Sequence, residues 1–263
     1  MPKTANARVG IIKNLNIMMK TKILLVLSVV AMLITACKKE DPAANVYVKK
    51  IVIESTVLGS TATVATDYEW DNNLLVSERT TTTIMGMSST VNYHYEYEGN
   101  NVIRKLTIDS RGDTTQVYNY TYENGRLKTF ETMWGSGVIT GYNSNGEITS
   151  YEDETLDVKR KFAFEWKDGD LVKAQVNKTY TDEITSDTTY VYKYDDKISP
   201  YTNMPIVQAI DDAESLGRRA SKHNLLDSDY TYEYKSGRLV RMITNGGAKV
   251  SFYYTDGVGP DEE

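Results

Sequence analysis

The chain has 263 residues, 36 acidic and 30 basic side chains, and a formal net charge of −6. An acidic protein of this kind is a poor candidate for nucleic-acid binding, which requires a basic surface. The sequence contains one cysteine and two histidines, which excludes an internal disulfide and leaves little material for a Cys/His metal centre.

The N-terminal region has the pattern of an export signal. Lys20 and Lys22 precede an almost uninterrupted apolar run over residues 23–34, so a hydrophobic segment follows a basic one. The run is shorter than the about 20 residues that a membrane-spanning helix needs. A signal of this kind would start at Met18 or Met19.

The apolar run ends at a cysteine, in the sequence Ile34-Thr35-Ala36-Cys37. This sequence resembles a bacterial lipobox, which implies that residues 1–36 are removed as a lipoprotein signal peptide and that Cys37 carries palmitate-type acyl chains. Two or more acyl chains give a stable membrane anchor. The next residues, Lys38-Lys39-Glu40-Asp41, resemble the signal that sends Bacteroidota lipoproteins to the outer face of the outer membrane. A plain secretory signal with a coincidental cysteine is the alternative.

The mature chain would be more acidic. Residues 1–36 contain five basic residues and no acidic ones, so their removal leaves 25 basic and 36 acidic residues and a net charge of −11. After a tether at residues 37–45, we expect one β domain at residues 46–256, since all-β domains often run beyond about 200 residues. Residues 257–263 would form an acidic tail.

A short motif recurs through the expected domain. It consists of two aromatic residues separated by one residue, a turn with Gly or Asn, and then Leu or Val. Full copies start at Tyr68, Tyr95, Tyr120, Phe164 and Tyr232, and weaker copies lie at Tyr142 and Tyr192. Most second aromatic residues lie 20 to 28 residues apart, a spacing that fits two strands and two turns per unit.

The turns predict how the strands pair. Asn124-Gly125 and Asp168-Gly169 are preferred central pairs of a two-residue type I′ hairpin turn, and Ser236-Gly237 fits less well. The resulting pairs are Tyr122 with Leu127, Trp166 with Leu171 and Tyr234 with Leu239. The residues beside the turns become Glu123 with Arg126 and Lys167 with Asp170, which are opposite charges across the ladder, and Lys235 with Arg238, which are like charges.

Alternation along the strands predicts two different faces. The two aromatic residues of each motif share an inner face, and the residue between them, such as Glu96 or Glu165, points outward. Regular alternation also places Arg104, Lys173 and Arg241 on the inner face, opposite the first aromatic residues. Their aliphatic stems would lie along aromatic rings.

These patterns predict an all-β fold. Thr-, Ser-, Val- and Ile-rich segments between the motifs favour extended structure, and we expect an antiparallel meander of about 14 to 16 strands in successive hairpins. The meander would curl toward an open or closed barrel. One short helical excursion is expected near residues 205–220, where Ile206, Ile210, Ala213 and Leu216 fall at helical spacing. It would cover an end of the sheet.

The repeats resemble the YD repeats of Rhs-type proteins, whose consecutive hairpins form a long curling sheet. Together with the lipobox and the stretch from Tyr194 to Tyr201, they resemble a Bacteroidota surface lipoprotein family of unknown function whose fold is described as porin-like. The resemblance covers residues 46–255. It implies a meandering sheet that curls toward a barrel, and it brings no catalytic residues.

No catalytic, cofactor-binding or metal-binding residue is expected. His94 and His223 lack partners at ligand spacing, and His94, in the middle of a strand, should face solvent. Asp195-Asp196 and Asp211-Asp212 lack the loop spacing of a calcium site. A carboxylate pair for glycoside hydrolysis stays open, because it needs only two groups about 5 to 10 Å apart.

The sequence therefore favours a monomeric, non-enzymatic, lipid-anchored protein on the outer membrane, facing the cell exterior. Its role would be structural or the binding of a glycan or surface partner, without a cofactor. A glycan hydrolase is the main alternative. A transmembrane β-barrel is disfavoured, because a lipid-facing strand surface needs an unbroken apolar band, and charges are expected on both strand faces.

Overall fold

A computed structural model describes residues 46–57, 59–208 and 220–261. They form seventeen strands and one 3-10 helix. The first strands are β1 (Val48–Val57), β2 (Ser60–Asp71), β3 (Leu74–Ile84), β4 (Met87–Glu98), β5 (Asn101–Ile108), β6 (Thr114–Glu123), β7 (Arg126–Glu131), β8 (Gly135–Tyr142) and β9 (Ile148–Thr155). They are followed by β10 (Val158–Lys167), β11 (Asp170–Tyr180), β12 (Thr185–Val191), β13 (Lys193–Ile198), η1 (Ile206–Gln208), β14 (His223–Leu226), β15 (Tyr230–Lys235), β16 (Arg238–Thr244) and β17 (Lys249–Tyr254).

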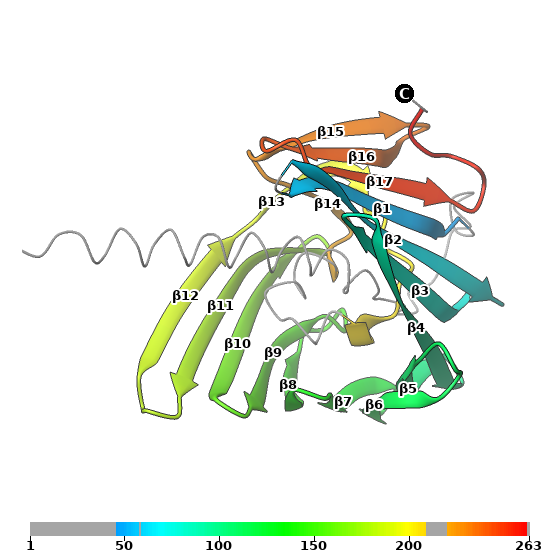
Figure 1. Cartoon of the computed structure of the whole chain (residues 1–263). Helices are drawn as coiled ribbons and strands as arrows, with labels where there is room; N and C mark the ends of the chain where they lie inside the picture. Colours follow the sequence, from blue (N-terminus) through cyan, green and yellow to red (C-terminus); the bar gives the residue numbers. More distant parts are fainter. Residues whose placement is uncertain (1–45, 58, 209–219, 262–263) are drawn as a thin grey trace, which may run out of the picture.

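Fifteen of these strands form one antiparallel sheet. Neighbours in the chain pair from β1 to β12, and the other side of β1 pairs with β17, which continues through β16 to β15. The sheet ends on β12 and β15, which do not pair with each other, so it curls without closing into a barrel (Figure 1). The all-β antiparallel meander predicted from the sequence is confirmed, in its open form.

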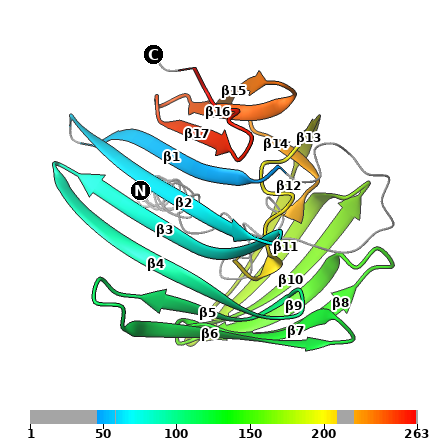
Figure 2. The ribbon, with the colours of Figure 1, turned by 90° about the vertical axis from the view of Figure 1, so that its right-hand side faces the viewer.

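The N-terminal strand lies inside the sheet rather than at an edge. Ile51 faces Phe252 and Ile53 faces Val250 across the β1–β17 ladder. All four side chains are buried. This apolar pairing joins the two ends of the domain, and it places the last three strands beyond β1 (Figure 2).

The hairpin registers predicted from the turns are confirmed. Tyr122 faces Leu127, Trp166 faces Leu171 and Tyr234 faces Leu239, and the flanking pairs also match. Both central residues of each turn have positive φ, for example 52° at Asn124 and 74° at Gly125. This is the geometry of a type I′ turn, whose twist matches that of the strands.

These three hairpins, and likewise the β2–β3 and β4–β5 hairpins, each contain a β-bulge that alternation does not predict. The register shifts at Glu69/Trp70, Glu96/Tyr97, Thr121/Tyr122, Glu165/Trp166 and Glu233/Tyr234. In each case the strand after the turn contains one extra residue. Such a bulge increases the local twist and bends the strand, which suits a sheet that must curl.

The bulges overturn the predicted places of three cations. Arg104, Lys173 and Arg241 face Glu96, Glu165 and Glu233 on the outer face, and the charged atoms of these pairs lie 2.7, 2.5 and 3.2 Å apart. The prediction of an inner position was wrong, because the extra residue moves each cation to the opposite face.

The inner face is aromatic but not purely apolar. Tyr151 is fully buried and stacks on Phe162, with 4.4 Å between the ring centroids. Lys105, 3% exposed, places its ammonium 4.4 Å from the ring centroid of Tyr93 and 5.3 Å from that of Tyr118. A buried cation is thereby stabilised by two aromatic faces.

The expected helical excursion is described only at its start. The 3-10 helix η1 lies on the concave side of the sheet (Figure 1, gold), and Met204 and Val207 there are fully buried. Ile210, Ala213 and Leu216 lie outside the described residues. No helix within the described ranges is long and apolar enough to cross a membrane.

Candidate functional site

One end of the sheet is held together by aromatic side chains. This end, here called the belt rim, carries the turns at residues 72–73, 99–100, 124–125, 143–147 and 168–169. Seven aromatic groups there donate a hydrogen bond to a backbone carbonyl of a neighbouring strand pair, at 2.5 to 3.0 Å. The bonds run from Trp70 to Val48, Tyr97 to Leu75, Tyr122 to Val102, Tyr142 to Leu127, Trp166 to Ile148, Tyr194 to Leu171 and Tyr254 to Leu239.

These bonds replace missing parts of the backbone ladder. The pairing of β3 with β4 begins at Ser77, two residues after Leu75. The carbonyl of Leu75 therefore lies outside this ladder. The same two-residue gap occurs at all seven acceptors. A half-buried carbonyl needs a donor, and the aromatic hydroxyl or indole N–H supplies it. Tyr142 and Tyr194, which belong to the weaker copies of the sequence motif, form this hydrogen bond as well.

Burial of these hydroxyls changes their acidity. Loss of contact with water raises the pKa of Tyr142 to about 12, against a smaller opposing effect of the nearby Arg126 guanidinium. Burial also raises the pKa of Tyr97, Tyr122 and Tyr254. These four hydroxyls therefore stay protonated, and able to donate, throughout the neutral range.

The opposite end of the strands has a different surface. This end, here called the apolar rim, carries the turns at residues 85–86, 132–134, 156–157 and 181–184, and between the first two of them the polar turn at residues 109–113. Its exposed large apolar side chains are Ile84, Met85, Met87, Met133, Trp134, Leu156, Tyr180 and Ile184. The exposed fraction reaches 65% at Trp134 and 91% at Leu156, which is unusual for side chains of this size when they cluster.

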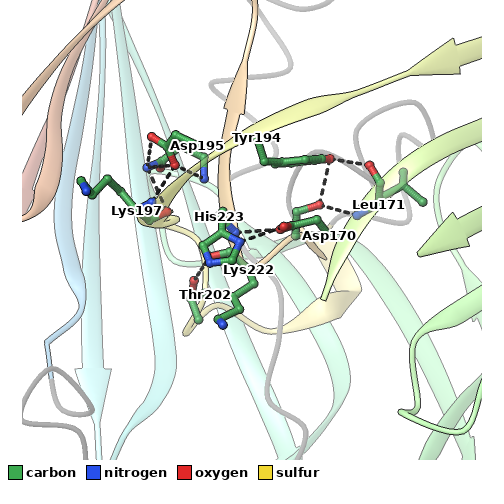
Figure 3. A network of polar contacts seen from close by, with 10 residues as sticks. Asp170, Leu171, Tyr194, Asp195, Lys197, Thr202, Lys222 and His223 are labelled. Carbon is green, nitrogen blue, oxygen red and sulfur yellow. Dashed lines mark hydrogen bonds and ion pairs between the residues drawn. The ribbon is translucent and has the colours of Figure 1, made fainter. Parts of the chain in front are cut away.

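A polar network lies in the gap between the two edge strands of the sheet, β12 and β15. The two-stranded sheet β13–β14 lies between β12 and the group β15–β17 (Figures 1 and 2). Its contacts reach the turn between β10 and β11, where Lys222 N–H donates to the Gly169 carbonyl at 3.0 Å. We call Asp170, Leu171, Tyr194, Asp195, Ser221, His223 and Asn224 the seam network (Figure 3).

The seam network brings together the residue types of a hydrolytic triad without its geometry. The Asp170 carboxylate accepts a bond from the His223 backbone at 2.9 Å and lies 2.8 Å from His223 Nδ1. Ser221 is 1% exposed, donates to the Tyr194 hydroxyl at 2.9 Å and accepts from Leu171 N–H at 3.0 Å. Among the described residues no hydrogen bond joins Ser221 to His223. A nucleophilic serine needs that bond and access to a substrate.

Asp195 ties the small sheet to β15. Its carboxylate accepts from Lys197 N–H at 2.8 Å, from the Asn224 backbone and side chain at 3.1 to 3.3 Å, and from the Tyr234 hydroxyl. Burial, and then the hydrogen bond and negative charge of Asp195, raise the pKa of Tyr234. A carboxylate that accepts this many hydrogen bonds from different strands stabilises their relative positions.

Two shallow depressions on the outer face of the described sheet also contain acidic side chains. One, of about 290 Å³, contains Asp67 and Glu69. Asp67 pairs with Lys50 at 3.3 Å, Glu69 accepts from Ser77 at 2.8 Å, and both carboxylates are open to solvent. The second, of about 550 Å³, lies beside Lys128, which pairs with a neighbouring glutamate. Glu78 also lines the first depression and is 3% exposed, but it lies across from Tyr68 and Tyr93 on the inner face of the sheet. The outward carboxylates Asp67 and Glu69 lack the shielding that a glycosidase acid requires.

The candidate residues from the sequence lie in different places. Cys37, with the signal peptide and tether, lies outside the described residues, as does Asp211-Asp212. His94 is exposed on β4, as predicted. The seam role of His223 was missed, because its partner Asp170 is 53 residues away in the chain. Within the described ranges no group of three or more His, Cys, Asp or Glu could hold a metal ion.

Comparison with protein-family models and with curated proteins gives no match. The resemblances to a lipobox and to YD-repeat lipoproteins therefore stay predictions. Function has to be inferred from the geometry of this chain.

Proposed function

We propose that this protein is a lipid-anchored component of the outer membrane, attached through Cys37, facing the cell exterior and acting by non-enzymatic binding. The observation that carries the proposal is the difference between the two rims. The chain joins the sheet at the belt rim, where Trp70 donates to the Val48 carbonyl. Eight of the fifteen exposed large apolar side chains among the described residues stand at the other rim.

The length of the tether favours an outward apolar rim. Ten residues separate Cys37 from Val48, which reach about 35 Å when fully extended. Strand β1 has ten residues, about 33 Å. The apolar rim could touch the membrane only if the tether ran back along a whole strand. With a relaxed tether, the belt rim faces the membrane and the apolar rim faces away from it.

A binding role fits the chemistry better than catalysis. The Ser221 hydroxyl is buried and engaged, and Asp67 and Glu69 are exposed and paired. The apolar rim, by contrast, presents Trp134 and Leu156 to solvent. Exposed aromatic and apolar groups of this kind bind sugars or proteins. The ligand classes that we propose are accordingly a surface glycan or a surface protein.

The anchor can be tested directly in cells. Cys37→Ser should leave an unprocessed precursor and abolish metabolic labelling by palmitate, while the matched variant Thr35→Ser should keep both processing and label. Unchanged labelling of Cys37→Ser would remove the lipoprotein assignment.

Surface exposure needs its own measurement. Protease added to intact cells should degrade the wild-type protein, and replacement of Lys39, Glu40 and Asp41 by alanine should protect it without loss of palmitate. A wild-type protein that resists protease on intact cells but is cut after lysis would contradict the outward orientation.

A further inference from the structure

Three consecutive turns of the apolar rim form one continuous surface. Gly135 faces Thr155 across the β8–β9 ladder, so the residues just beyond them, Trp134 and Leu156, are neighbours. Val158 faces Tyr180 across β10–β11. The backbone also joins the last two turns, because Thr181 N–H donates to the Asp157 carbonyl at 3.2 Å. We call Met133, Trp134, Leu156, Tyr180 and Ile184 the tip patch.

The turns beneath the tip patch have defined conformations. Trp134 N–H donates to the Thr132 hydroxyl at 3.1 Å, and that hydroxyl donates to the Gly135 carbonyl at 3.2 Å. A side chain at Gly135 would place its Cβ only 2.0 Å from the Glu154 carbonyl oxygen. Only glycine therefore allows the two backbones to lie this close together. This order lowers the entropy that binding would cost.

The last turn is ordered in the same way. Ile184 N–H donates to the Asp182 carboxylate at 3.3 Å, and Tyr180 N–H donates to the Ile184 carbonyl at 2.9 Å. Between them Glu183 has φ of 64°, an uncommon conformation for a residue with a side chain. The last turn is therefore also held in one conformation, with Tyr180 and Ile184 exposed at its ends.

The patch has an acidic border. Glu131, Asp157, Asp182 and Glu183 are exposed beside it. In the described part of the chain, Asp157, Asp182 and Glu183 form no ion pair, whereas the nearby Lys159 is neutralised by a glutamate at 3.1 Å. Such a border repels anionic lipid headgroups and acidic polysaccharides, and it attracts a basic surface.

We infer that the tip patch is a docking site for a protein partner whose apolar centre is bordered by lysine or arginine. The inference rests on the proposed outward orientation of the apolar rim. Trp, Tyr and Met are enriched in the centres of protein interfaces. The aliphatic Leu156 and Ile184 offer no ring for stacking on a sugar, which favours a protein over a glycan.

Site-specific photocrosslinking in the native cells tests this docking. The full-length lipoprotein would carry p-benzoylphenylalanine in place of Leu156 or Ile184, with the exposed belt-rim residue Asn100 as the matched control position. We expect one discrete, protease-sensitive adduct of the same mass at both patch positions and none at Asn100. Asp157→Lys with Asp182→Lys should lower its yield about tenfold through loss of charge complementarity.

Other results would overturn the inference. These are an equal adduct at Asn100, an adduct removed by periodate, a lipid adduct, an adduct insensitive to the charge reversal, or no adduct. Each variant is also labelled with palmitate and its thermal midpoint measured. A folded, labelled protein without the expected adduct contradicts the docking site alone, whereas loss of the label from the parent protein contradicts the anchor.

Discussion

The two ends of this sheet use aromatic residues in opposite ways. At the belt rim, Trp166 is half-buried and its indole donates to the Ile148 carbonyl at 2.8 Å. At the apolar rim, Trp134 is 65% exposed on a turn. A high tyrosine and tryptophan content is therefore not a binding signal in itself. The position of the ring relative to the hairpin turn decides whether it holds the fold or faces solvent.

The largest expected effect compares the two tryptophans. Trp166→Ala should lower the free energy of unfolding by about 2 to 3 kcal/mol, since it removes a large packed ring and leaves a carbonyl without its donor. Trp134→Ala should change it by less than about 0.5 kcal/mol, as for most exposed sites. Denaturant unfolding of both variants measures the difference, and equal losses would show that the two rims do not differ in this way.

The turns of the belt rim give the next effect. Gly125 and Gly169 have φ of 74° and 89°, so Gly→Val at either should cost about 1 to 3 kcal/mol. A Cβ at Gly125 meets no atom within 4 Å, and one at Gly169 makes an ordinary contact at 3.4 Å from Lys222, so backbone strain is the main cost at both positions. Gly125→Asn, which tolerates positive φ, is the control. Wild-type thermal midpoints in both valine variants would refute the proposed role of the turns.

A smaller effect isolates one hydroxyl. Tyr97→Phe keeps the ring but removes the bond to the Leu75 carbonyl at 2.7 Å, which should cost about 1 kcal/mol. Tyr180→Phe, on the apolar rim, should be neutral within about 0.5 kcal/mol. If the two substitutions proved equally harmless in chemical denaturation, the belt bonds would contribute nothing to stability.

The contribution of the belt tyrosines to the free energy of unfolding does not change with pH near neutrality and falls only in alkali. Folding raises the pKa of the belt tyrosines, to about 12 at Tyr142, while the unfolded chain ionises near pH 10. Their contribution to stability is complete below about pH 10 and is lost as the pH rises toward the folded pKa. Replacing Tyr97, Tyr122 and Tyr142 by Phe should reduce the drop in unfolding free energy between neutral pH and about pH 11. An unchanged drop would contradict this linkage.

Local rules were enough to predict the hairpins. A type I′ turn needs two residues at positive φ, and Asn-Gly, Asp-Gly and even Ser-Gly supply them. Once the turn is placed, the register follows for the residues beside it. That is why the pair Tyr234–Leu239 was placed correctly although Lys235 faces Arg238.

The bulges had a sequence signal that alternation alone misses. After the turn in four of the five bulged hairpins, two apolar residues follow each other at the bulge, in Leu75-Val76, Val102-Ile103, Leu171-Val172 and Leu239-Val240. A pair of this kind breaks the alternation of a regular strand, and the second residue is the extra one of each bulge. With this signal, the outward positions of Arg104, Lys173 and Arg241 could have been predicted.

Long-range contacts could not be predicted in this way. The pairing of β1 with β17 and the contact of Asp170 with His223 depend on how far the whole sheet curls. Curling is the sum of many small twists, and no single segment encodes it. The same holds for the open seam, which leaves β12 and β15 unpaired with each other.

The belt rim holds the fold, and we expect the apolar rim to add nothing to its stability. The free energy of unfolding of a triple variant, Trp134→Ser, Leu156→Ser and Ile184→Ser, measured by denaturant titration, decides this. We expect a value within about 1 kcal/mol of wild type, since exposed sites rarely matter for stability. A loss of about 3 kcal/mol or more would mean that the exposed turns of the apolar rim support the fold after all.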